Sequence, residues 1–95
     1  MKLSIPEEAV ADAVAIRTWL LERSPCAAVR FDEQLGHTMR LILEHEAGGR
    51  YLDGYRRVLF FRRRYMVIYS MANEMLIVRN VADCRREPGY WLDNE

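Results

Sequence analysis

The first half of the chain places apolar residues three and four positions apart, which is the spacing of one helix face. In the stretch 6–23 this stripe comprises Ala9, Ala13, Ile16 and Leu20, with Val10 and Leu21 widening it. In the stretch 25–46 it comprises Ala28, Phe31, Leu35, Met39 and Ile42. We expect two helices with these bounds, and the very short break between them predicts an antiparallel hairpin.

Local signals support both helix starts. Ser4 stands three residues before Glu7, which is the spacing of a capping box, and Pro6 suits a first helical turn. Ser24 is the expected N-cap of the second helix and Pro25 its first residue. Glycines 48 and 49 are expected to end that helix.

The second half changes to short runs rich in β-branched and aromatic residues, separated by turn-like segments. We expect strands near 2–5, 55–61, 65–71 and 75–82. The order is then β-α-α-β-β-β, an α+β fold in which the helical hairpin packs on one face of an antiparallel sheet. The chain is expected to form a single domain, 1–95. The side chains expected to face the helices are Val58, Phe60, Val67 and Tyr69.

These strands are too apolar for a sheet with one face in water, because such strands alternate apolar and polar residues. The helical hairpin can cover only one face of the sheet. The other face is expected to be shielded by the C-terminal tail, by a bound partner, or by both.

Composition narrows the class of protein. The 95 residues are 51% apolar, which argues against disorder. We see no signal peptide and no apolar run of the roughly 18 residues that a membrane helix needs. Cys26 and Cys84 are far apart and are expected to be reduced thiols. The expected location is the cytoplasm, with no membrane partner.

The zero net charge conceals a segregation of charge. Residues 1–46 carry five basic and eight acidic side chains, residues 47–86 carry nine basic and three acidic, and residues 87–95 add three acids. Thirteen of the fourteen basic residues are arginine, whose fork suits phosphate and carboxylate. The positive field of residues 47–86 therefore points to an acidic partner, although the arginines at 62–64 would also be tolerated in a solvated turn.

Several stretches taken together resemble the RelE/ParE superfamily of type II toxins. The matching residues are Ser24-Pro25, Ala27-Ala28, Phe31, Leu35, Gly49-Arg50, Arg64-Tyr65, Val67-Ile68-Tyr69, and Arg86 with Pro88, Tyr90 and Trp91. The resemblance covers nearly the whole chain. It implies a toxin neutralised by a cognate antitoxin, whose C-terminal segment lies on the helical hairpin and sheet in a hetero-oligomer. RelE-like members cut mRNA on the ribosome and ParE-like members poison DNA gyrase, and fold alone does not decide between them.

The resemblance also provides a test, because RelE-like nucleases need several basic groups around the ribose and phosphate. Arg57, Arg86 and Tyr90 match catalytic positions of that set. Leu59 and Met66 stand where two further bases would be, and Asp83 stands where many members carry histidine. The incomplete set favours a ParE-like gyrase inhibitor. A ribosome-dependent endoribonuclease is the alternative, and a toxin fold that only binds its antitoxin is a third.

The residues expected to meet the partner gather on the sheet and its rim. They are Arg57, Leu59, Arg62, Arg63, Arg64, Met66, Arg79, Arg85 and Trp91. Strand pairing is expected to bring the distant arginines into one basic surface.

No cofactor or metal is expected. His37 and His45 lie eight residues apart on one helix, roughly 12 Å at 1.5 Å per residue, which is too far to share a metal. Cys84 neighbours Arg85 and Arg86, which would lower its pKa, but no histidine lies near it in sequence to support a nucleophile. No glycine-rich phosphate loop is present.

Overall fold

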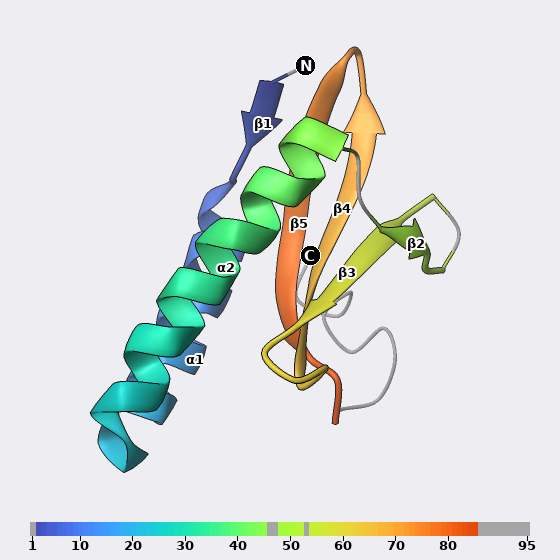
Figure 1. The fold of residues 1–95 in the computed structure, drawn as a ribbon. Helices are drawn as coiled ribbons and strands as arrows, with labels where there is room; N and C mark the ends of the chain where they lie inside the picture. Colours follow the sequence, from blue (N-terminus) through green and yellow to red (C-terminus); the bar gives the residue numbers. More distant parts are fainter. Residues whose placement is uncertain (1, 46–47, 53, 86–95) are drawn as a thin grey trace.

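The computed structural model describes residues 2–45, 48–52 and 54–85. The elements in chain order are β1 (Lys2–Ser4), α1 (Glu7–Arg23), α2 (Pro25–His45), β2 (Gly49–Arg50), β3 (Arg56–Phe60), β4 (Tyr65–Ala72) and β5 (Met75–Asp83). The two helices run side by side along one face of the sheet, as Figure 1 shows. The predicted α+β class and the helical hairpin on one face are confirmed.

The five strands lie in the order β1-β5-β4-β3-β2. The pairs β2–β3, β3–β4 and β4–β5 are antiparallel, as predicted. The pair β1–β5 is parallel, so the sheet is mixed rather than antiparallel throughout. An edge strand can accept a neighbour running in either direction, and a three-residue run carries no signal of direction. The short strand β2 was not among the predicted strands.

The starts of the two helices differ from each other. Pro6 is the N-cap of α1 and makes no side-chain cap, so the predicted capping box of Ser4 is wrong; Ser4 ends β1 instead. The prediction for α2 is confirmed, because the hydroxyl of Ser24 accepts a hydrogen bond from the Ala27 N–H at 3.3 Å.

The core lies between the hairpin and the sheet. The predicted stripe of α1 points inward, and the predicted stripe of α2 lies against the same cluster, with Phe31 and Ile42 fully buried. The sheet residues Val58, Phe60, Val67 and Tyr69 face the helices as predicted. Val10 and Leu21 do not widen the buried stripe of α1: they are exposed, because α2 and the sheet cover only a narrow face of that helix.

An aromatic cluster holds α2 against the β3–β4 hairpin. The Phe31 ring lies 5.6 Å from Phe60, 6.2 Å from Phe61 and 5.5 Å from Tyr65, measured between centroids. Its contacts with Phe61 and Tyr65 are edge-to-face, an arrangement that aromatic quadrupoles favour. Phe31 therefore ties the first half of α2 to the turn between β3 and β4.

Asp12 of α1 accepts hydrogen bonds from the part of β5 that lies beyond the end of its pairing with β1. The register of β4 and β5 shifts between Ile68 and Tyr69, a bulge that leaves Arg79 without a partner opposite. Beside this bulge, Asp12 Oδ2 accepts hydrogen bonds from Asn80 Nδ2 at 2.8 Å and from the Val81 N–H at 3.1 Å. Burial raises the pKa of the Asp12 carboxyl, and these two hydrogen bonds oppose the shift.

Candidate interaction surface

The sheet face that points away from the helices carries a second, smaller apolar cluster. Met66, Ile68 and Ala82 are buried in it, and Tyr51, Tyr55, Leu59 and Cys84 pack around them. Leu59 and Met66 are direct partners across β3 and β4. Tyr51 and Tyr55 thus supply part of the cover that the apolar strands require. The C-terminal tail, expected to supply more, lies outside the described residues.

Arg57 lies at the edge of this cluster. It stands opposite Ile68 in the sheet, and its Nη1 lies 3.9 Å from the Met66 sulfur. Its guanidinium carbon is 4.5 Å from the centre of the Tyr51 ring, a cation–π contact. Arg57 is therefore held between an aromatic ring and a thioether. The neighbouring positions 59 and 66 carry apolar side chains, so they add no second basic group.

Arg79 lies on the same outer face, two strands away from Arg57. Its Nε donates a hydrogen bond to the Ser70 hydroxyl at 3.0 Å. The bulge in β5 frees Arg79 from the regular ladder, and the contact with Ser70 fixes its direction. The outer face thus presents two arginines with a band of apolar side chains between them.

The thiol of Cys84 behaves differently from the prediction. Burial raises its pKa, and Arg57 opposes the shift only in part. The cation that acts on Cys84 is Arg57 of β3, which lies two strands from β5 in the sheet, and the predicted lowering of the pKa is wrong. A thiol whose pKa is raised stays protonated at neutral pH, which argues against a nucleophile.

A second basic group surrounds Trp19 at the other side of the sheet. The guanidinium carbons of Arg23, Arg64 and Arg85 lie 3.8, 5.1 and 5.9 Å from the centre of the indole ring. The three arginines come from α1, from the β3–β4 turn and from the end of β5. Sequence analysis missed Trp19, because only tertiary packing brings these segments together.

Asp83 is neutralised within this second group. Arg85 donates to both of its oxygens, from Nε at 3.1 Å and from Nη2 at 2.8 Å. The hydrogen bond from the Arg85 side chain is the largest cause of the lowered pKa of Asp83. The negative charge of Asp83 is thus balanced by an adjacent arginine.

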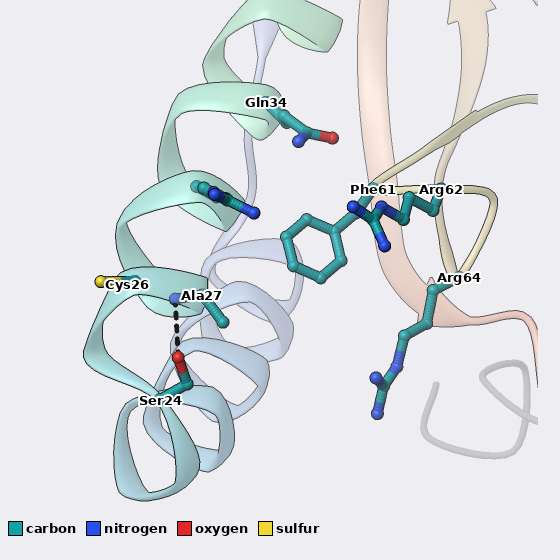
Figure 2. A pocket seen from close by; sticks show the side chains of 8 residues that line it. Ser24, Cys26, Ala27, Gln34, Phe61, Arg62 and Arg64 are labelled. Carbon is teal, nitrogen blue, oxygen red and sulfur yellow. Dashed lines mark hydrogen bonds between the residues drawn. The ribbon is translucent and has the colours of Figure 1, made fainter.

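The turn between β3 and β4 has an unusual backbone. Phe61, Arg62 and Arg63 have φ of 55°, 57° and 65°, so three consecutive residues that are not glycine adopt the left-handed conformation. The Phe61 ring points from this turn toward α2 (Figure 2). Arg62 and Arg63 are exposed, and Arg64 is partly buried.

The arginines predicted to form one basic surface therefore fall into two groups. Arg57 and Arg79 lie on the outer face of the sheet, whereas Arg64 and Arg85 lie around Trp19. The remaining predicted residues, Arg86, Tyr90 and Trp91, lie outside the described residues.

The outward side of the helical hairpin is the other candidate surface. Arg17 of α1 and Asp32 of α2 form an ion pair of 2.8 Å across the hairpin. Around it, apolar side chains stay exposed, among them Val14 at 56% and Val29 at 55%. Helical spacing places Val10 and Leu21 on the same stripe of α1 as Val14. Exposed apolar residues at such spacing are typical of a helix face that meets a partner.

Within the described ranges, no helix is long and apolar enough to cross a bilayer, and no group of three or more potential ligands is placed to hold a metal.

The chain matches one family model over residues 3–88, described as the ParE toxin of the type II toxin-antitoxin system, parDE. A search of curated proteins finds no match. Among solved structures, the chain is similar to one described as the chromosomal ParDE TA system from P. aeruginosa, with a TM-score of 0.76 and 16% sequence identity. The match covers 87% of this chain and 95% of that chain. At this identity the likeness to the solved structure is one of fold.

Proposed function

Because the chain belongs to the ParE toxins of type II toxin-antitoxin systems, we propose that it inhibits DNA gyrase and that a cognate antitoxin neutralises it. In this proposal the chain inhibits gyrase by binding to it, and its own residues make and break no covalent bond. The proposed site of action is the cytoplasm.

The observation that carries this proposal is the pairing of Leu59 with Met66 beside Arg57. A nuclease of the related RelE type would need basic groups at both apolar positions. By analogy with lost oxyanion donors, each missing group would weaken transition-state stabilisation by about 2–4 kcal/mol. Arg57 alone, packed against Tyr51, supports binding better than proton transfer.

The antitoxin is expected to lie on the helical hairpin and to continue toward the sheet as an amphipathic helix, an added strand, or both. Two features support this placement. The outward side of the hairpin exposes Val14 and Val29, which an apolar helix face would cover. The arginines of residues 47–86 would attract acidic residues of the same segment.

The test is induced expression in cells with two readouts, namely plasmid supercoiling with the SOS response, and the integrity of mRNA on ribosomes. We expect gyrase-linked DNA damage with intact mRNA. The damage should persist in a Tyr90→Phe variant, since binding does not need that phenol as an acid. Rapid mRNA cleavage with unchanged supercoiling, abolished by Arg86→Ala, would replace gyrase inhibition with the endoribonuclease activity.

A second experiment addresses the antitoxin. The small protein encoded beside this chain should co-purify with it and suppress the growth defect. A chain that expresses freely alone, stays monomeric and is harmless would argue against a toxin–antitoxin pair.

A further inference from the structure

A pocket of about 420 Å³ lies between the first half of α2 and the β3–β4 turn. Figure 2 shows the Gln34 side chain and the Phe61 ring directed into the space between the two elements, while the Cys26 sulfur points away. The volume falls within the range of small-molecule sites. Among the residues that line it are Arg30, Gln34, Phe61, Arg62 and Arg64.

Three of these residues are arginines, and no described residue that lines the pocket is acidic. Neither Arg30 nor Arg62 forms an ion pair with any described residue. The Nε of Arg64 is buried and has no hydrogen-bond partner among the described residues. Because buried N–H groups are almost always paired, this donor calls for an acceptor from outside the described residues, and a bound ligand would supply one.

The surroundings leave this positive charge largely uncompensated. Asp83 lies close enough to Arg64 for that arginine to help lower its pKa, but Arg85 already engages both carboxylate oxygens. The first turn of α2 contains no acidic residue, whereas α1 begins with Glu7 and Glu8. The positive end of the α2 dipole therefore adds to the field of the arginines.

The turn presents two of these arginines at a cost in backbone strain. Arg62 and the residues on either side of it adopt the left-handed conformation, which is unfavourable for side chains of this kind. The packing of Phe61 against Phe31 and a hydrogen bond from the Cys84 N–H to the Arg64 carbonyl at 2.8 Å hold the turn in place. The backbone that carries Arg62 and Arg64 is thus held in place before any ligand arrives.

We infer that this pocket binds a phosphate group. A carboxylate is satisfied by a single guanidinium fork, whereas a phosphate dianion offers three strong acceptor oxygens to donors approaching from several sides. Arg30 lines the pocket from α2, and Arg62 and Arg64 line it from the turn, with the Arg64 guanidinium also lying over the Trp19 ring. Phosphate binding here does not depend on which target the toxin inhibits.

The test titrates the full-length chain with inorganic phosphate at constant ionic strength, followed by calorimetry and by amide chemical shifts. We expect saturable binding, with the largest shift changes at residues 24–34 and 61–64. Arg30→Gln and Arg62→Gln should each weaken binding about tenfold, the usual worth of a charge-assisted contact. Arg40→Gln is the matched control, since it removes an exposed arginine of α2 roughly 15 Å further along the helix.

Parallel titrations use adenosine monophosphate and succinate. Equal affinity for the nucleotide and for inorganic phosphate would mean that the phosphate alone is recognised, and tighter binding of the nucleotide would identify a nucleotide as the source. Three outcomes would each overturn the inference. Phosphate affinity could stay unchanged in both Arg30→Gln and Arg62→Gln, or it could fall no further in them than in Arg40→Gln. Alternatively, succinate could bind as tightly as phosphate.

Discussion

At the scale of single residues, two carboxylates have opposite environments. Asp12 is desolvated between α1 and β5, and its pKa is raised. Asp83 is hydrogen-bonded by Arg85, and its pKa is lowered. Asp12 stabilises the fold as an acceptor of hydrogen bonds from the sheet. Asp83 stabilises it through its ion pair with Arg85.

Replacing Asp12 by alanine would leave the Val81 N–H and the Asn80 amide without their acceptor. Unpaired buried donors cost about 1–3 kcal/mol each, so we expect Asp12→Ala to lower the free energy of unfolding by about 2–4 kcal/mol. Urea denaturation measures the change. Asp32→Ala is the matched control, because it breaks only the exposed pair with Arg17 and should cost about 1 kcal/mol or less. Equal losses in the two variants would show that Asp12 does not support β5.

The two carboxylates should titrate on opposite sides of 3.8, the ordinary value for aspartate. Since the folded state binds the Asp12 proton more tightly than the unfolded state, Asp12 reduces stability as the pH rises from 3.8 through its raised pKa. Asp83 acts in the reverse sense: its contribution is present above pH 3.8 and is lost as the pH falls through its lowered pKa.

Carboxyl carbon chemical shifts followed against pH measure both values. We expect Arg85→Gln to move the midpoint of Asp83 upward, because the largest cause of its shift is removed. The midpoint of Asp12 should not change in that variant, which serves as the internal control. An unmoved Asp83 would mean that Arg85 is not its partner in solution.

At the scale of elements, the β3–β4 turn departs most from ordinary backbone geometry. The β4–β5 turn also has two left-handed residues, Asn73 and Glu74, but these are the two central positions of a tight hairpin, where a type I′ turn requires such angles. The β3–β4 turn instead has three consecutive left-handed residues, two of them arginine. Its conformation is held by the packing of Phe61 and by the hydrogen bond from the Cys84 N–H to the Arg64 carbonyl, and not by local preference.

Glycine adopts left-handed angles readily, so Arg63→Gly should relieve strain. We expect a gain of up to about 1 kcal/mol in the free energy of unfolding, partly offset by the greater freedom of glycine in the unfolded chain. Arg56→Gly makes the same replacement in a regular strand and should lower stability by about 0.5–1 kcal/mol. Thermal denaturation compares the two variants, and a loss in both would mean that the turn is not strained in solution.

Sequence patterns predicted the elements better than the contacts between them. The inward stripe of α1 follows from its 3.6-residue period. The inward direction of Val58 and Phe60 follows because successive side chains of a strand point to opposite faces of the sheet. The parallel pairing of β1 could not be predicted, because its partner is distant in the chain and three residues have no directional pattern. The division of the arginines into two groups could not be predicted either, since it depends on which side of the sheet each strand end reaches.

At the scale of the whole molecule, apolar and basic surfaces lie on different sides. The hairpin exposes valines on its outward side, whereas arginines gather on the outer sheet face and around Trp19. One long partner segment could meet both kinds of surface in sequence, with an apolar part followed by an acidic part. This arrangement agrees with the proposed mode of antitoxin binding.

Val14→Glu tests that mode, because it places a charge in the exposed apolar stripe without disturbing the core. We expect antitoxin affinity to fall at least about tenfold, with little change in the melting temperature of the toxin, since the side chain is already 56% exposed. Calorimetry with the purified antitoxin measures the affinity. Glu8→Gln, on the first turn of the same helix, is the control for a surface change. Unchanged affinity in Val14→Glu would place the antitoxin elsewhere.

The parallel pairing of β1 with β5 also governs when the protein becomes complete during synthesis. Lys2 pairs with Met75, a separation of 73 positions (75 minus 2), so the first strand emerges long before its partner exists. At roughly 5–20 residues per second, the interval is about 4–15 seconds. Asp12 is likewise synthesised long before Asn80 and Val81, which donate hydrogen bonds to it. On a ribosome that stalls before β5, the nascent chain therefore lacks both the strand that pairs with β1 and the groups that donate to Asp12, so the sheet cannot be completed until β5 has been made.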